Sequence, residues 1–183
     1  MNRNRYSSVF PNLKSLTTAA MLTAISVIIG IFCKNFLNFG NGLFRITFEN
    51  LPIVLSGILF GPLVGGMVGV STDLISYLLS SQTYPPNLIV TAGAFAIGFC
   101  SGLTASLIPK NKTSLRIICS ALCGHLVGSV IIKPIGLYQF YGILVLWRIP
   151  LYLLIVPIEI VLLRILFRNA SFQKMLQAFD RKS

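Results

Sequence analysis

Long apolar runs, separated by short polar stretches, follow one another along almost the whole chain. A helix needs about 20 mostly apolar residues to cross the hydrocarbon core of a membrane, and roughly 150 residues here are available to such helices. The pattern predicts six membrane-spanning helices, at about residues 14–33, 47–61, 62–80, 87–108, 115–137 and 143–167. Strands are not expected, because the runs lack the alternation that marks the strands of a membrane barrel. We therefore predict one all-α integral membrane domain over residues 1–183, a compact bundle of six transmembrane helices.

Composition argues against a soluble, basic nucleic-acid-binding protein. Hydrophobic residues make up 55% of the 183 residues, and the mean hydropathy is +0.82. A soluble domain of this size could not hide so much apolar surface from water. The 15 Lys and Arg residues outnumber the 4 Asp and Glu residues and lie mostly at the edges of the apolar runs. The chain is therefore expected in a lipid bilayer, with no nucleic-acid partner.

The distribution of Lys and Arg predicts how the helices are oriented. If the N-terminus is cytoplasmic, the outer side of the membrane receives only Lys34, Arg45, Lys133 and Arg148. The other cations then fall on the inner side, as the positive-inside rule requires. Both termini are thus expected in the cytoplasm. The first apolar run is expected to be a retained helix, since no small-residue cleavage pattern follows it.

Small residues in the first three apolar runs indicate close contacts between helices. Ala20 and Ala24 stand one turn apart on the first helix, a spacing that lets another helix approach closely in lipid. They serve either internal packing or the docking of another subunit. The next two runs carry a glycine at every fourth position, and Asp73 continues this stripe: Gly57, Gly61, Gly65 and Gly69. The four cysteines are interpreted as small apolar side chains, and no metal site is expected.

A few polar residues remain inside or beside the apolar runs, and they are the candidates for function. An ionisable side chain within a span is costly and usually faces the bundle interior or a cavity, and Asp73 is such a side chain. Four outer cations with only Glu49 and Asp73 nearby favour an anion-binding site. The outer loop at about residues 34–46 mixes Phe, Asn and Gly, which is typical of a loop that folds over a site and excludes water.

The fifth and sixth runs each carry a polar face. His125, Ser129 and Lys133 recur at four-residue intervals on the fifth run. Arg148, Tyr152 and Glu159 lie together on the sixth, since eleven residues make nearly three helical turns, and both polar faces are expected to point into the bundle. A hydrolase built on His125 and Ser129 would need a strained nucleophile turn, which the sequence lacks. The motifs of zinc proteases, phosphate loops and dinucleotide sites do not occur either. A structural hydrogen bond between helices is the favoured interpretation of the group formed by His125, Ser129 and Glu159.

Several motifs occur in a recognisable order. The alanine-bearing first helix is followed by Arg45-Ile46-Thr47-Phe48-Glu49-Asn50-Leu51-Pro52, then Ser56-Gly57-Ile58-Leu59-Phe60-Gly61-Pro62, then Gly69 and Thr72-Asp73-Leu74. A later group consists of Tyr84-Pro85-Pro86, Lys133-Pro134 and Trp147-Arg148-Ile149-Pro150. This order resembles the substrate-binding S components of energy-coupling factor (ECF) vitamin transporters, and the later group looks most like their folate branch, FolT. The resemblance covers about residues 14–168.

The resemblance implies a substrate-binding transporter subunit of a prokaryotic plasma membrane rather than an enzyme. Such a subunit captures a vitamin at the outer face and delivers it inward together with a transmembrane coupling protein and two ATPase subunits. It also implies that Ala20 and Ala24 meet the coupling protein and that the outer loop covers the ligand. No cofactor is implied.

Folate chemistry fits the polar residues. Folate joins a flat pterin with adjacent N–H donors to a glutamate tail with two carboxylates. Asp73 is expected to accept hydrogen bonds from the pterin, an aromatic side chain to stack on the rings, and a cation to hold the tail, with arginine favoured for bidentate contacts. The expected substrate-binding residues are Phe44, Arg45, Glu49, Asp73, Tyr84, Pro85, Lys133, Trp147 and Arg148.

Three other interpretations stay open at the level of sequence. The first is an S component for another vitamin or precursor, such as pantothenate or a pyrimidine. The second is a small intramembrane enzyme that uses His125 and Glu159. The third is an assembly protein held together by the glycine stripe.

Overall fold

Helices form nearly all of the chain that the computed structural model describes, which is residues 13–39, 44–79, 87–109, 111–170 and 172–173. The elements are α1 (Leu13–Phe36), α2 (Asn50–Phe60), α3 (Pro62–Leu79), α4 (Leu88–Leu107), α5 (Thr113–Gly124), the π-helix η1 (His125–Ile132), α6 (Lys133–Tyr141), the 3-10 helix η2 (Gly142–Trp147) and α7 (Arg148–Arg168). Two short strands, β1 (Asn38–Phe39) and β2 (Phe44–Arg45), pair antiparallel with Asn38 opposite Arg45. This hairpin is a small departure from the all-helical expectation.

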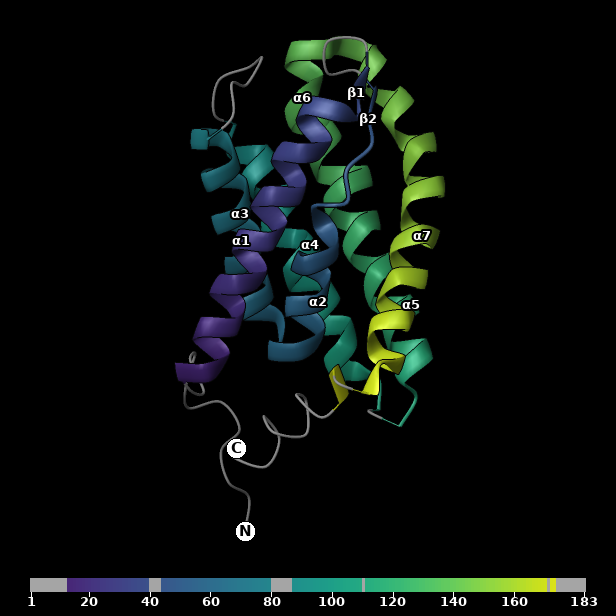
Figure 1. Ribbon diagram of the computed structural model, residues 1–183. Helices are drawn as coiled ribbons and strands as arrows, with labels where there is room; N and C mark the ends of the chain where they lie inside the picture. The colour runs from purple at the N-terminus through teal and green to yellow at the C-terminus, as the bar shows by residue number, and fades with distance from the viewer. Residues whose placement is uncertain (1–12, 40–43, 80–86, 110, 171, 174–183) are drawn as a thin grey trace.

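The long helices lie side by side and share one general direction (Figure 1). α1 begins and α7 ends at the same end of the molecule, whereas α6 and the β1–β2 hairpin lie at the other end, which we call the hairpin end. The first three residues of the expected outer loop, residues 34–36, belong to α1, so this helix reaches further toward the hairpin end than its apolar run indicated.

Four helical stretches are long and apolar enough to cross a membrane, namely Lys14–Phe36, Pro62–Leu79, Leu88–Leu107 and Thr113–Arg168. The last is an uninterrupted helical run of 56 residues, which turns back on itself at the hairpin end (Figure 1). The stretch between the fifth and sixth expected spans is therefore helical rather than a plain connector. Gly142 has a φ of 56°, a backbone conformation that suits glycine, and it marks the reversal between α6 and η2.

Glycines bring α2, α3 and α4 into backbone contact. A Cβ atom added to Gly65 would lie 2.6 Å from the Gly57 Cα and 2.6 Å from the Gly98 carbonyl oxygen. A Cβ atom at Gly69 would collide with the Ala94 backbone. The predicted glycine stripe therefore packs against α4, except at Gly61, where a φ of 94° ends α2 and leaves open space.

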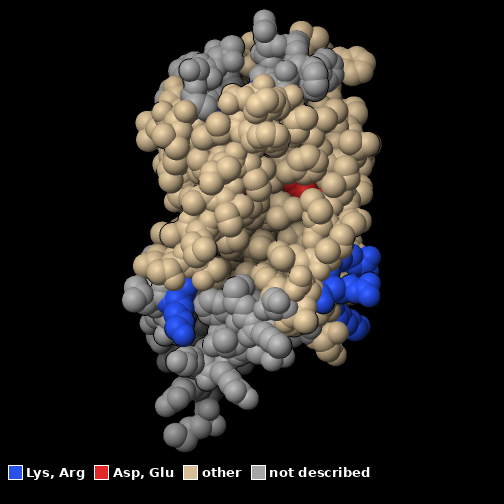
Figure 2. Space-filling model, viewed as in Figure 1, with Lys and Arg blue, Asp and Glu red and all other residues tan. Residues whose placement is uncertain are grey.

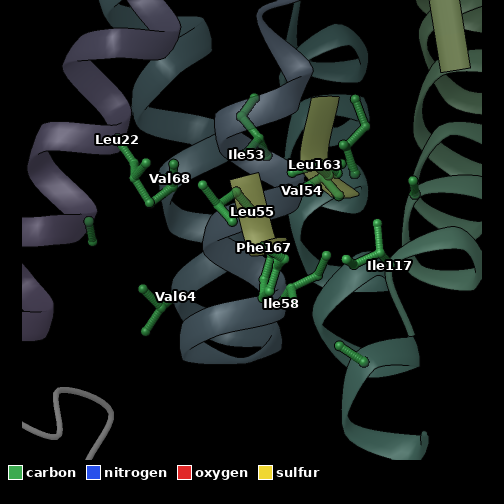
Figure 3. Packing of buried hydrophobic residues seen from close by; sticks show 14 residues of the cluster. Leu22, Ile53, Val54, Leu55, Ile58, Val64, Val68, Ile117, Leu163 and Phe167 are labelled. Atoms are coloured by element: carbon green, nitrogen blue, oxygen red, sulfur yellow. The ribbon is translucent and has the colours of Figure 1, made fainter. Parts of the chain in front are cut away.

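The short helix α2 lies at the centre of the bundle, in contact with α1, α3, α4, α5 and α7. Its apolar residues Ile53, Val54, Leu55 and Ile58 are buried and form the middle of the main hydrophobic cluster. Figure 3 shows these side chains with Phe167 beside them. At the end of α2, the Arg116 guanidinium donates hydrogen bonds of 2.9 Å to the carbonyl oxygens of Ile58 and Ala105, so one side chain ties α2 to α4.

The outer surface is apolar, as expected for a chain in lipid. Large hydrophobic side chains such as Leu78, Leu88 and Leu153 are 79–86% exposed. On the face shown in Figure 2, Lys and Arg gather toward the end where α1 begins, and the band above them is almost free of charged residues. This surface cannot face water favourably over such an area.

Candidate substrate-binding site

A cavity opens among α1, α2, α3, α4, α6 and α7 in the half of the bundle nearer the hairpin end. Its space measures about 650 Å³ with the open mouth included. The lining residues are Lys34, Thr47, Glu49, Ile53, Gly69, Thr72, Asp73, Ser76, Val90, Ala94, Lys133, Leu137, Arg148 and Tyr152. Polar groups from five separate segments therefore converge on one partly apolar space.

Lys133, the first residue of α6, is the cation that contacts the α2 side of the cavity. Its ammonium donates a 3.4 Å hydrogen bond to Asn50 Oδ1 and lies 4.0 Å from Glu49 Oε1. The Lys133 side chain is 12% exposed and that of Glu49 is 14% exposed, so the pair is largely withdrawn from solvent. Asn50 is fully buried, and its Nδ2 has no hydrogen-bond partner among the described residues. Both contacts of Lys133 are long, which leaves its ammonium able to bind a further acceptor.

Asp73 and its neighbour Thr72 form the α3 wall. The Thr91 hydroxyl of α4 donates a 2.7 Å hydrogen bond to Asp73 Oδ2, which fixes the carboxylate. Thr72 is buried, and its hydroxyl has no hydrogen-bond partner within the described part of the chain. A buried hydroxyl without a partner is costly, so a ligand group that reaches Thr72 would recover part of that cost.

Two further cations come from the end of α1 and the start of α7. Lys34 donates a 3.2 Å hydrogen bond to the Ser76 carbonyl oxygen near the end of α3. The Arg148 guanidinium lies 5.3 Å from the ring centre of Tyr141, a cation–π contact. The described lining thus carries Lys34, Lys133 and Arg148 against Glu49 and Asp73, and it has an excess of one positive charge.

His125, Ser129 and Glu159 form a buried polar group next to Tyr152. His125 Nε2 is 2.5 Å from Glu159 Oε2, and His125 Nδ1 is 3.2 Å from the Ser129 hydroxyl. The His125 ring lies 6.1 Å from the Tyr152 ring, centre to centre. All three residues of this group are at most 1% exposed, and none lines the cavity. A substrate therefore has no route to the Ser129 hydroxyl, and the group joins η1 to α7, as the hydrogen-bond interpretation predicted.

The structure brings together four of the expected site residues, Glu49, Asp73, Lys133 and Arg148. Trp147 is 61% exposed and is not among the lining residues. Phe44 and Arg45 are described only as backbone in β2, and Tyr84 and Pro85 lie outside the described residues.

The expected substrate-binding residues do not include Lys34, Thr72 and Tyr152, which line the cavity. Lys34 enters the sequence argument only as one of the four outer cations that favour an anion-binding site. Tyr152 follows Arg148 by one turn, and this spacing was the available signal that it shares the same wall.

Ala20 and Ala24 are exposed on α1 and do not line the cavity. They line open grooves between α1 and α3, in which Thr23 and Ser71 also take part. These grooves are open and mostly apolar, and no residue of the cavity lining contributes to them.

Residues 14–178 match the family of ECF transporter substrate-specific components. The chain belongs to this family. As an S component it is a vitamin-transport subunit and not an enzyme, which removes the hydrolase interpretation of His125 and Glu159.

Relatives in the family differ in their substrates. The S component is 30% identical over 153 residues to the riboflavin transporter RibU of Staphylococcus aureus (strain TCH60), covering 83% of this chain and 74% of RibU. It is 29% identical over 75 residues to the folate transporter FolT of Clostridium novyi (strain NT), covering 40% of this chain and 44% of that protein. The crystal structure of FolT bound with folic acid has the same fold, with a TM-score of 0.64, 24% identity, and coverage of 82% of this chain and 90% of FolT.

Proposed function

We propose that this S component binds folate at the outer face of a prokaryotic plasma membrane and delivers it inward with an ECF coupling protein and two ATPase subunits. The observation that carries the proposal is the cavity lining, which holds Lys34, Lys133 and Arg148 against only two carboxylates. A ligand with negative charge would balance this excess, and folate supplies two carboxylates on its glutamate tail. The fold shared with folate-bound FolT is consistent with this assignment.

The walls suit the two ends of folate differently. Asp73, held by Thr91, offers its second carboxylate oxygen to the paired N–H donors of a pterin. The Lys133 and Arg148 side chains supply charged donors for the tail carboxylates. The proposed arrangement also places the hairpin end outside and both termini in the cytoplasm, with six crossings.

Riboflavin is the second candidate, because RibU is a relative that is 30% identical over 83% of the chain. Riboflavin carries no ionised group at neutral pH, so it would leave the positive excess of the lining unbalanced. Pantothenate has one carboxylate but no aromatic ring for the cavity to hold. The charge of the lining therefore disfavours riboflavin, and the missing ring disfavours pantothenate.

Calorimetry on the purified subunit in detergent tests the proposal. Folate should bind without ATP, riboflavin and pantothenate should bind more weakly, and Arg148→Ala should weaken folate more than a pterin that lacks the glutamate tail. A lost charged hydrogen bond is worth about 1.5–3 kcal/mol, so the folate loss should be roughly ten- to hundredfold. Tight riboflavin binding without folate binding would replace the folate assignment. Equal losses for folate and the tail-free pterin would show that Arg148 does not hold the tail.

A further inference from the structure

Glu49 is held on three sides although it belongs to the segment between β2 and α2. The Ser26 hydroxyl of α1 donates a hydrogen bond to the Glu49 carbonyl oxygen. A Cβ atom added to Gly30, one turn further along α1, would lie 2.6 Å from Glu49 Oε2, so the carboxylate sits directly against the α1 backbone. Glu49 also precedes the first residue of α2, where the helix dipole favours a negative charge. The position of this carboxylate is therefore set by the scaffold.

The other Glu49 oxygen, Oε1, faces Lys133 across 4.0 Å. Both side chains are largely buried, so their interaction is screened less than that of a surface pair. The distance is too long for a hydrogen bond, and the nearer partner of Lys133 is the neutral Asn50 amide. Glu49 thus offsets the charge of Lys133 without occupying its donors.

We propose that Glu49 is an internal counter-ion of Lys133 that limits the affinity for anionic substrates and so sets the selectivity of the cavity. The inference rests on the proposed function, since it assigns Lys133 to a substrate carboxylate. A carboxylate that approaches Lys133 shares the cation with Glu49 and is repelled by it. Glu49 therefore opposes the binding of an anion, and this role differs from direct contact with the ligand.

The sign of one substitution separates the two roles. Glu49→Gln keeps the side-chain shape and removes the charge, so it should strengthen folate binding roughly three- to tenfold, the size expected for a mostly buried ion pair. It should leave a pterin without the glutamate tail almost unchanged. If Glu49 instead accepted hydrogen bonds from the ligand, the same substitution would weaken binding, and that result overturns the proposal.

Two matched variants test whether the effect passes through Lys133. Asp73→Asn removes the same charge from the same cavity, but on another wall and together with the proposed pterin acceptor, so it should weaken folate binding rather than strengthen it. In a Lys133→Gln background, Glu49→Gln should give no gain. Equal gains in both backgrounds, or an equal gain from Asp73→Asn, would mean a general field effect and would overturn the proposal.

A ligand-free measurement separates this inference from the folate assignment. Melting temperatures of the subunit in detergent should fall with Glu49→Gln and with Lys133→Gln, and the double variant should lose less than both losses together. If the unaltered subunit did not bind folate, the folate proposal would fail, but the counter-ion role of Glu49 would not be affected. Fully additive losses in melting temperature would show that the pair does not interact, and they would overturn the counter-ion role.

Discussion

The environment of Lys133 illustrates how neighbours far apart in the sequence define a single residue. Its ammonium contacts Asn50, the first residue of α2, and faces Glu49, the residue before it. Lys133 and Asn50 are 83 positions apart in the sequence. An ionisable side chain on an otherwise apolar helix has few tolerable destinations, so the sequence alone predicted that Lys133, Arg148 and Asp73 face the interior. It could not predict which of them would be partnered, because those partners arrive from other helices.

Trp147 shows where residue-level prediction fails. It precedes Arg148 directly, but a neighbour on a helix points about 100° away, so the position of Arg148 at the cavity does not bring Trp147 there as well. Trp147 also ends the 3-10 helix η2, whose existence the apolar pattern did not indicate. The aromatic ring expected to stack on a ligand is therefore mostly exposed on the outer surface, and Tyr152 lines the cavity instead.

Removing one member of the buried His125–Glu159 pair should lower the free energy of unfolding far more than replacing both members with leucine. Glu159→Ala leaves His125 without its 2.5 Å partner, and removal of one member of a buried pair typically costs about 3–5 kcal/mol. The double variant His125→Leu with Glu159→Leu removes both polar groups and should recover much of that loss. Equilibrium unfolding in mixed micelles measures both. A double variant at least as unstable as Glu159→Ala would show that the pair stabilises more than hydrophobic packing at the same place.

At the scale of elements, the positions of the helices followed from the apolar runs, but their ends did not. Helix ends depend on caps and tertiary contacts rather than on hydropathy, which explains why α1 runs on to Phe36 and α6 fills the expected connector. The glycine repeat predicted close packing correctly, yet it gave no hint that the partner would be α4. A repeat fixes the face of a helix, whereas the partner depends on how the whole chain folds.

Adding one methyl group between α3 and α4 should destabilise the bundle. A Cβ atom at Gly98 would lie 2.9 Å from the Gly66 nitrogen and closer still to the Gly65 carbonyl oxygen, so Gly98→Ala must push the helices apart. Overpacking of this kind costs about 1–3 kcal/mol. Ala92→Leu adds a larger group to the same helix at an exposed position and should be nearly neutral. Equal melting temperatures for Gly98→Ala and the unaltered subunit would contradict the contact.

At the scale of the whole molecule, the cavity and the α1–α3 grooves occupy separate surfaces. The grooves contain Ala20 and Ala24 but no residue of the cavity lining. The resemblance to S components predicts that these alanines meet the coupling protein, and their exposure is consistent with that role. Substrate binding and assembly should therefore be separable by mutation.

Bulky residues on α1 test this separation. Ala20→Trp with Ala24→Trp should leave folate binding by the solitary subunit nearly intact, because neither alanine lines the cavity. The same change should abolish ATP-driven uptake, since large side chains prevent a close helix crossing. Ligand titration and uptake by reconstituted vesicles give the two readings. Loss of both would assign the alanines to internal packing, and retained uptake would remove them from the docking surface.

The length of α2 has a consequence for how this protein enters the membrane during synthesis. Its 11 residues extend only about 16 Å, roughly half of the hydrocarbon thickness, and the buried Asn50 adds a polar group. A segment this short and polar is not expected to insert into the membrane stably on its own. Gly61 alone joins α2 to α3. The Ile58 carbonyl oxygen near the end of α2 accepts a hydrogen bond from Arg116, which can form only after residue 116 has been synthesised. The central helix of the bundle should therefore settle late, after more than half of the chain has left the ribosome.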